Sequence, residues 1–166
     1  MLAALALAGC SAGLPEDVAK LGYVNQAQRF ALDVPRGWTV RETAGPAALI
    51  ATGPAAADGG RPSLNVTVAP VADGTTLEDF AQTSRRGLER LAGFKLLSEE
   101  AAAAAARRAW TVTFEASPAG RPVKEKQLYV VTGGRGYVVT ATALAEDFAA
   151  EEANFETCLR SFRAGW

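Results

Sequence analysis

Acid–base chemistry in this sequence can rest only on carboxylates, lysine or tyrosine, because the chain contains no histidine. Acidic residues adjoin at Glu99-Glu100, Glu146-Asp147 and Glu151-Glu152, and a hydrolase of the glycosidase type needs two carboxylates that face each other across a cleft. Neighbouring residues of a strand point to opposite faces, however, and charged residues on helices usually face water. We therefore predict no catalytic residue, no metal site and no cofactor, and keep a carboxylate-based cell-envelope hydrolase as the alternative.

Cys10 ends a short apolar run, and residues 7–10 (Leu-Ala-Gly-Cys) resemble the lipobox of bacterial lipoproteins. Crossing a bilayer takes about 20 apolar residues, so the run before Cys10 is too short, and its small residues are typical of a secretory cleavage site. The resemblance implies cleavage before Cys10 and lipid on its sulfur. We predict a signal peptide at residues 1–9, which is partial because no Lys or Arg precedes Leu2, and a lipidated tether at residues 10–22.

Cys158 has a different predicted role. It shares one face of a predicted helix with Phe155, Leu159 and Phe162, where a free cysteine acts as a small buried apolar group. A nucleophilic role is disfavoured, because the chain offers no histidine to activate the thiol. If Cys10 carries no lipid, a disulfide between Cys10 and Cys158 becomes the alternative.

The other motifs are predicted to be structural. Residues 133–136 (Gly-Gly-Arg-Gly) join two strands and lack the following helix of a phosphate-binding loop, so they favour a hairpin turn. Aromatic residues in strands more often pack in a sheet than line a ligand site; here they are Trp38, Trp110 and Tyr137. A solvated face is favoured over an anion- or protein-binding patch for the clustered arginines, which are Arg85, Arg86, Arg90, Arg107 and Arg108.

The composition is that of one globular domain. Hydrophobic residues make up 49% and charged residues 21% of the chain, and the length after the predicted signal suits a single domain. The formal net charge of −1 gives no overall basic excess of the kind that favours binding to nucleic acid or anionic lipid.

Alternating apolar and polar residues predict one-faced strands, and therefore an antiparallel sheet. The first places Phe30, Leu32 and Val34 on one side, and others centre on residues 64–68 and 110–114. Residues 127–132 and 136–144 are predicted to pair as a hairpin. Turn-forming residues predict a turn at 35–37 and loops at 53–62 and 117–122.

Two helices and one ambiguous run complete the prediction. The first helix begins at Thr75, with Glu78 as the partner in a capping box, and stops near Gly93. The second spans about residues 145–162, and its buried stripe consists of Phe148, Phe155, Leu159 and Phe162. Alanine has the highest helix propensity, yet residues 101–106 lead directly into a strand, so we expect an exposed turn or an extended approach there.

The order of these elements resembles the PsbP-like family, whose fold is shared with the Mog and DcrB proteins. The resemblance covers roughly residues 23–163 and is carried by residues 30–38 (FALDVPRGW), 65–68 (NVTV), 75–80 (TTLEDF), 137–143 (YVVTATA) and 159–162 (LRSF). It implies an α+β fold, with a single domain at residues 23–166 and an antiparallel β-sheet flanked by helices on both faces. Family members have different roles, and no binding residue matches position by position, so the ligand-binding residues stay unassigned.

We therefore expect a membrane-anchored, extracytoplasmic lipoprotein, held at the cell membrane through Cys10. The expected role is noncatalytic binding, as an accessory subunit of a membrane complex with a protein partner in the envelope. Ser11 provides no aspartate retention signal, which leaves the outer membrane open in a two-membrane organism. Besides the hydrolase, the alternative is a carrier of a small apolar ligand, which needs an enclosed cavity of about 300 to 1,000 Å³.

Overall fold

The computed structural model describes residues 13–45, 47–56, 59–105 and 107–166. The predicted signal peptide and Cys10 lie outside the described residues. The elements follow one another in this order: α1 (Glu16–Ala19), β1 (Tyr23–Asn25), β2 (Phe30–Leu32), β3 (Thr39–Glu42), β4 (Ala47–Thr52), β5 (Ser63–Pro70), α2 (Leu77–Leu88), β6 (Lys95–Ala104), β7 (Arg107–Ala116), the 3-10 turn η1 (Pro118–Gly120), β8 (Val123–Thr132), β9 (Arg135–Leu144), α3 (Phe148–Ser161) and β10 (Arg163–Ala164).

Two antiparallel sheets organise the chain. The larger has seven strands in the order β3-β4-β5-β9-β8-β7-β6, and the smaller has the order β1-β2-β10. Strands β8 and β9 pair along their full length through a turn at Gly133 and Gly134, whose φ angles of 58° and 71° suit glycine. The predicted hairpin is confirmed, and its first strand begins earlier than the sequence indicated, at Val123.

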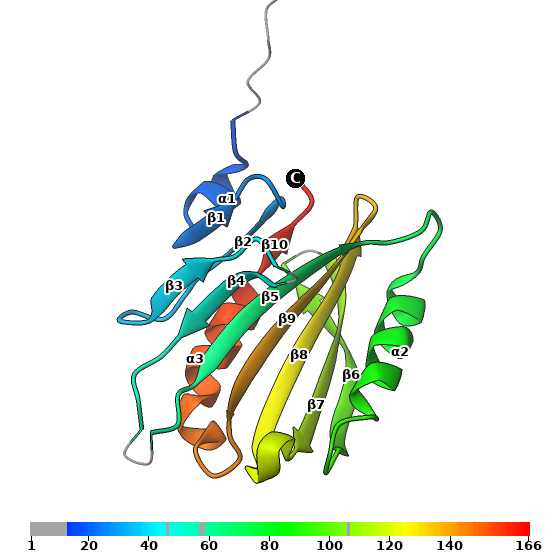
Figure 1. Cartoon of the computed structure of the whole chain (residues 1–166). Coiled ribbons are helices and arrows are strands. Elements are labelled where there is room, and N and C mark those ends of the chain that lie inside the picture. The colour runs from blue at the N-terminus through cyan, green and yellow to red at the C-terminus, as the bar shows by residue number, and fades with distance from the viewer. Residues whose placement is uncertain (1–12, 46, 57–58, 106) are drawn as a thin grey trace, which may run out of the picture.

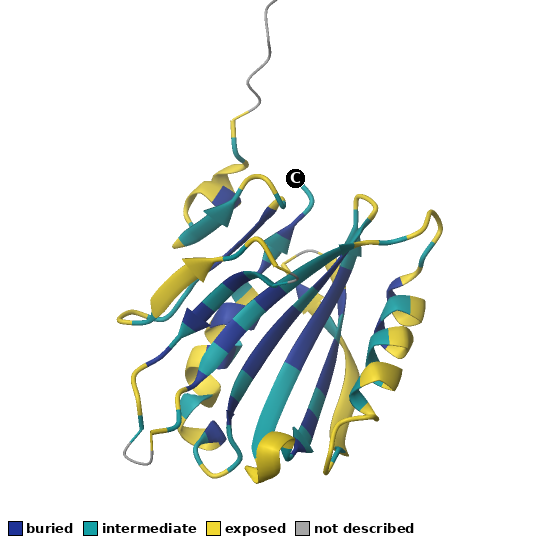
Figure 2. Cartoon of the chain, in the orientation of Figure 1, coloured by how far each residue is buried: buried dark blue, intermediate teal, exposed yellow. Residues whose placement is uncertain are grey.

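Helices α2 and α3 cover opposite faces of the large sheet (Figure 1). Leu77 of α2 belongs to one apolar cluster with Tyr129 of β8. Leu159 of α3 belongs to another cluster with Leu128, the residue directly before Tyr129. Consecutive strand residues point to opposite faces, so the two helices pack on the two sides of β8. Figure 2 shows the buried residues concentrated along these central strands. The predicted fold class, α+β with an antiparallel sheet flanked on both faces, is confirmed.

The alanine run extends a strand. Residues 101–104 of β6 pair antiparallel with residues 107–110 of β7, and Ala105 turns the chain with φ 56°. Ala106 lies outside the described residues. Cross-strand pairing with β7 overrides the helix propensity of alanine, which amounts to less than 1 kcal/mol per residue over most other residues. The predicted extended approach is confirmed, and it makes β6 an edge of the sheet.

Helix α2 begins one residue later than the sequence predicts. Thr76 is the N-cap: its hydroxyl oxygen accepts a hydrogen bond from the Asp79 N–H at 3.1 Å, and the hydroxyl donates to the Asp79 carboxylate at 2.7 Å. The predicted capping pair of Thr75 and Glu78 is therefore wrong, because Asp79 lies three residues after the true cap. Glu78 is instead free to form an ion pair with Arg108.

The other helix ends also shift. Helix α2 stops at Leu88, short of the predicted Gly93, which leaves Leu91 38% exposed. Helix α3 starts at Phe148 instead of near residue 145, and its predicted buried stripe is confirmed, with Phe155 and Cys158 fully enclosed. None of the helices in the described part of the chain is long and apolar enough to cross a bilayer.

The first described residues pack more tightly than the sequence indicated. Residues 16–19, within the predicted tether, form α1, whose Val18 is buried, and Asp17 forms an ion pair with Arg163 at 3.2 Å. The predicted one-faced strand near residue 30 is buried on both faces, Ala31 included. That prediction was wrong because β2 is the central strand of the small sheet and also contacts α3.

The predicted turns and loops are confirmed. The Trp38 N–H donates to the Pro35 carbonyl at 3.2 Å, and Gly37 adopts φ 82° in the turn between them. Residues 53–56 and 59–62, the described part of the first predicted loop, separate β4 from β5, and residues 117–122 separate β7 from β8.

Candidate functional site

Strand β6 is a long edge strand with a groove on each face. Among the described residues this ten-residue strand pairs with β7 alone, whereas the opposite edge, β3, has four residues. Most of β6 is exposed, as Figure 2 shows. The pairing is irregular between Leu96 and Ser98, which marks a bulge near the start of the strand. Residues 99–104 continue as a regular, unpaired edge, and such an edge presents a row of free backbone N–H and C=O groups.

The first groove lies between β6 and helix α2 and has a volume of about 510 Å³. We call it the α2 groove; its charged and aromatic lining consists of Glu78, Asp79, Arg85, Glu99 and Trp110. Glu99 accepts a hydrogen bond from the Trp110 indole at 3.1 Å, and the Arg85 guanidinium approaches the same carboxylate to 3.6 Å. Three carboxylates and one guanidinium line this groove, and Arg108 pairs with Glu78 from outside the lining, so the groove keeps a small acidic excess.

The second groove lies between β6 and helix α3 and has a volume of about 550 Å³. We call it the α3 groove; its charged lining consists of Glu100, Lys126, Glu152, Glu156 and Arg160. Glu156 bridges two of these, because it pairs with Lys126 on β8 and with Arg160 at 3.3 Å. Acidic groups again outnumber basic ones, although by a smaller margin than in the α2 groove.

The predicted separation of Glu99 and Glu100 is confirmed. Glu99 lines the α2 groove and Glu100 lines the α3 groove, because consecutive residues of a strand point to opposite faces. The strand therefore stands between these two carboxylates, which do not form the facing pair that a glycosidase-type hydrolase needs. Glu99 and Glu100 instead place one negative charge on each face of the sheet beside the free edge of β6.

The clustered arginines are partly tied into this region. Arg85 pairs with Glu89 at 2.8 Å as well as approaching Glu99, and Arg108 pairs with Glu78. The expectation of a solvated face holds for Arg86 and Arg90, which are exposed. Arg108 is also exposed, and both Arg85 and Arg108 pair with nearby acids, as a solvated face balanced by acids requires; these pairs also connect α2 to the β6–β7 hairpin.

Sequence analysis also missed a polar cluster on the same sheet face as α2. The Tyr129 hydroxyl donates to the Gln127 side chain, and the Gln127 amide donates to the Glu125 carboxylate at 3.3 Å. Burial raises the pKa of Glu125 above its ordinary value, and the hydrogen bonds from Gln127 and Thr142 oppose that shift. Among the described residues, no buried side-chain polar atom lacks a hydrogen-bond partner. The cluster is therefore internally satisfied.

The remaining predicted residues are structural. Tyr137 is buried and donates to the Gln28 carbonyl at 3.0 Å, while Trp38 packs edge-on against Phe155 with 6.1 Å between ring centroids. Burial raises the pKa of the Cys158 thiol to about 12, so the thiolate is scarce at neutral pH. Trp110 is the aromatic residue that contributes to a groove.

Neither groove suits an apolar ligand, because charged side chains line both of them. Within residues 13–45, 47–56, 59–105 and 107–166, no three His, Cys, Asp or Glu side chains come together as a group that could hold a metal ion. The arrangement instead offers what an extended polypeptide recognises: free backbone groups along a strand and a charged groove for the side chains on either face.

The chain matches one protein family and is similar in fold to several solved structures. A family model described as PsbP matches residues 20–164. Among solved structures, LpqN of Mycobacterium tuberculosis, described as involved in cell envelope biogenesis, is 18% identical with a TM-score of 0.64, over 80% of this chain and 81% of that chain. Cyanobacterial PsbP (CyanoP) of Synechocystis sp. PCC 6803 is 14% identical with a TM-score of 0.66, over 86% and 91% of the two chains.

The yeast protein Mog1p of Saccharomyces cerevisiae, described as Ran-binding, is 12% identical with a TM-score of 0.57, over 86% of this chain and 93% of that chain. No curated protein sequence matches the chain. Identities this low establish a shared fold and leave the function to be argued from the molecule itself.

Proposed function

The chain belongs to the PsbP family, and on this premise we propose that it is a noncatalytic, extracytoplasmic lipoprotein that serves as an accessory subunit of an envelope complex. Lipid on Cys10 would hold it at the membrane. The edge of β6 is the surface that binds its partner, and the ligand is an extended, basic segment of that partner protein. The observation that carries the proposal is the long unpaired strand between two acid-rich grooves.

Structural relatives are compatible with this role. LpqN is described as acting in cell envelope biogenesis and Mog1p as binding the protein Ran, so the same fold supports work in an envelope and the binding of a protein. The resemblance of residues 7–10 to a lipobox supports membrane attachment at Cys10. The absence of histidine from the chain supports a noncatalytic role, since acid–base chemistry near neutral pH most often uses that residue.

The backbone of β6 supplies affinity without sequence specificity. An extended segment that adds to a sheet edge pairs its own N–H and C=O groups with those of the edge strand. Native proteins block such edges with charged side chains, lysine above all, with proline or with bulges. Residues 99–104 contain neither lysine nor proline, their charges are those of Glu99 and Glu100, and the bulge lies before them at Leu97. This part of β6 is therefore left available for pairing.

The grooves supply specificity through charge. In an added strand, alternate side chains point to opposite faces of the sheet, so one set would enter the α2 groove and the other the α3 groove. Lysine or arginine in the first set would lie near Glu78, Asp79 and Glu99. Electrostatic complementarity of this kind selects partners and speeds their association.

The same charges oppose self-association through β6. A second copy of this chain, pairing strand to strand, would bring its own Glu99 and Glu100 beside those of the first copy. Like charges on adjacent strands are destabilising. The acidic edge therefore favours a basic partner over another copy of itself.

A synthetic peptide of alternating lysine and valine tests the proposal directly. Its affinity for the full chain carrying Cys10→Ala, measured by fluorescence anisotropy, should exceed that of a glutamate–valine peptide. N-methylation of every residue of the lysine peptide should abolish binding, because it removes the N–H groups from both edges of the added strand, whichever edge meets β6. Equal binding of the N-methylated peptide would show that charge alone acts and would contradict strand addition.

A lysine placed on the edge provides the matched test within the protein. Ala101 is exposed on β6. Ala149 is exposed on α3 and lines neither the α2 groove nor the α3 groove. Ala101→Lys should abolish binding of the lysine peptide, because it places a positive charge, like those of the peptide, on the free edge beside the α3 groove and protects that edge. Ala149→Lys changes the net charge equally and should bind as the unsubstituted chain does. Equal losses in the two variants would place the effect in the overall charge.

A further inference from the structure

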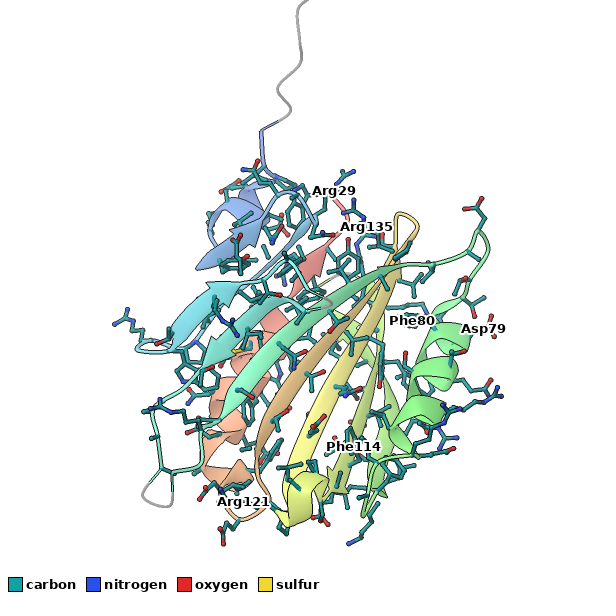
Figure 3. The ribbon with its side chains drawn as sticks, viewed as in Figure 1. Arg29, Asp79, Phe80, Phe114, Arg121 and Arg135 are labelled. Carbon is teal, nitrogen blue, oxygen red and sulfur yellow. The ribbon has the colours of Figure 1, made fainter. Side chains whose placement is uncertain are left out.

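One end of the molecule gathers three arginines that form no ion pair with an acidic residue of the described ranges. Helix α1, the carboxyl terminus and the β8–β9 turn all lie at this end (Figure 1), and Arg29 and Arg135 lie close together there in Figure 3. Arg29 and Arg107 are exposed and Arg135 is half-buried. We call these three residues the arginine end.

Hydrogen bonds hold the three residues around the carboxyl-terminal segment. The Gly165 N–H donates to the Arg29 carbonyl at 2.9 Å, and the Arg107 guanidinium donates to the Gly165 carbonyl at 3.1 Å. The Arg135 guanidinium donates to the Ala27 carbonyl at 3.4 Å. Within the part of the chain that the structure describes, none of the three forms an ion pair with a carboxylate.

Arg29 is also held in a backbone conformation that disfavours it. Its φ of 56° lies in the left-handed region, where a side chain beyond Cβ is strained and Gly or Asn is more usual. Strain of this kind tends to persist where function requires the residue. Ala105 and Ala119, however, share this φ, so the conformation marks a tight turn, and what distinguishes Arg29 is its exposure and its place beside Arg135.

We propose that the arginine end binds the phosphate groups of anionic phospholipids and so orients the domain on the membrane. The inference rests on the proposed lipid anchor for its geometry. The chain from Cys10 to Glu16, where α1 begins, can span at most about 20 Å, so lipid on Cys10 would keep this end beside the headgroups. The acidic residues of α1 at the same end, Glu16 and Asp17, are paired with Lys20 and Arg163, so they do not neutralise the three arginines.

The orientation has a consequence for the partner-binding edge. Strand β6 runs toward the arginine end, because Ala104 and Arg107 close the β6–β7 hairpin there. With the arginine end on the membrane, the α2 and α3 grooves extend away from the bilayer along β6. A partner segment bound to β6 would then point away from the membrane at a steep angle, and most of its length would lie clear of the headgroups.

Vesicle cosedimentation of the full chain carrying Cys10→Ala tests this inference without the lipid anchor. The protein should bind vesicles of phosphatidylcholine mixed with phosphatidylglycerol, bind weakly to phosphatidylcholine alone, and dissociate at high salt, where charges are screened. Each basic residue near an anionic surface strengthens binding about fivefold. Arg29→Gln with Arg135→Gln should therefore weaken binding roughly twenty-five-fold.

The matched control removes two arginines from the other end of the domain. Arg86 and Arg90 are exposed at and just beyond the carboxyl-terminal turn of α2, and replacing both with glutamine should leave vesicle binding unchanged. An equal loss in both double variants, equal binding to neutral vesicles, or saturable binding of inorganic phosphate that competes with vesicles would overturn the inference. Failure of the lysine–valine peptide to bind would leave this result unaffected, which separates the two proposals.

The Arg29→Gly variant separates a loss of lipid contact from a loss of binding caused by misfolding. It removes the charge and the backbone strain together, so the variant should be at least as stable as the unsubstituted chain while binding anionic vesicles about fivefold more weakly. Retained binding by a stable Arg29→Gly variant would exclude Arg29 from the lipid contact.

Discussion

The Trp110 indole donates a hydrogen bond to the Glu99 carboxylate, 3.1 Å away, at the point where β6 and β7 meet the α2 groove. Arg85 approaches the same carboxylate from α2 to 3.6 Å. Sheet and helix together therefore fix the position of one negative charge beside the free edge of β6. The contact also makes Trp110 an intrinsic reporter of what enters the groove.

Glu99→Gln should weaken binding of the lysine–valine peptide about fivefold, the effect of a partly exposed charge pair near 1 kcal/mol. Glutamine retains an oxygen that accepts the Trp110 hydrogen bond, so the groove keeps its shape. Trp110 fluorescence and anisotropy should report the change together. Glu146→Gln, an exposed substitution just before α3, is the control, and an equal loss there would remove Glu99 from the account.

Thr76→Ala should lower the free energy of unfolding by about 1 kcal/mol, because it deletes the hydroxyl that caps α2. Thr75 instead donates to the Ala72 carbonyl at 2.7 Å, an exposed bond, so Thr75→Ala should lower it by about 0.5 kcal/mol or less. Urea denaturation of the two variants measures the difference. The reverse order would restore Thr75 as the cap.

Gly136→Ala should destabilise the domain by about 1 to 3 kcal/mol through overpacking. A Cβ at Gly136 would collide with two ring atoms of Phe80, the residue of α2 that packs edge-on against Tyr129. Gly87→Ala, at a helical position with open space, should stabilise it by about 0.5 to 1 kcal/mol. Thermal unfolding of both variants checks the sign, and a neutral Gly136→Ala would show that α2 does not pack here.

Glu125 should make the domain less stable as the pH rises. Burial raises its folded pKa above the ordinary value of 4.5, so the folded state binds a proton more tightly than the unfolded state does. This contribution to stability is present below the unfolded pKa and is lost as the pH rises through the folded pKa. Glu125→Gln should remove that decline, and urea titrations across this pH range should show it. Glu146→Gln should leave the decline intact; persistence of the decline in Glu125→Gln would assign it to another group.

The parts of the fold that the sequence predicted are those with a local cause. Residues 133–134 are glycines at a two-residue turn, and Phe148, Phe155 and Leu159 recur at helical spacing, so the hairpin and α3 could be predicted from the residues themselves. The predicted N-cap of α2 was wrong by one residue because the sequence offers two equivalent capping pairs. Thr75 has Glu78 three residues later, and Thr76 has Asp79.

The grooves and the arginine end lacked such a local signal. Glu78 and Arg108 are 30 positions apart and meet only because α2 lies across the β6–β7 hairpin. The Arg135 guanidinium reaches the Ala27 carbonyl across 108 positions. Pairwise contacts of this range depend on how strands are ordered in the sheet, and alternation within a strand carries no information on that order. Overall charge was similarly uninformative, because a net charge says nothing about where charged side chains lie on the surface.

Hydrogen–deuterium exchange of the backbone amides, with and without a saturating excess of the lysine–valine peptide, tests the central claim most directly. Strand addition predicts slower exchange for the outward-facing amides of residues 99–104, because each gains a hydrogen-bond partner, and unchanged exchange along β3, the opposite edge of the same sheet. Unchanged exchange along β6 in the peptide complex, or protection confined to β3, would contradict the account.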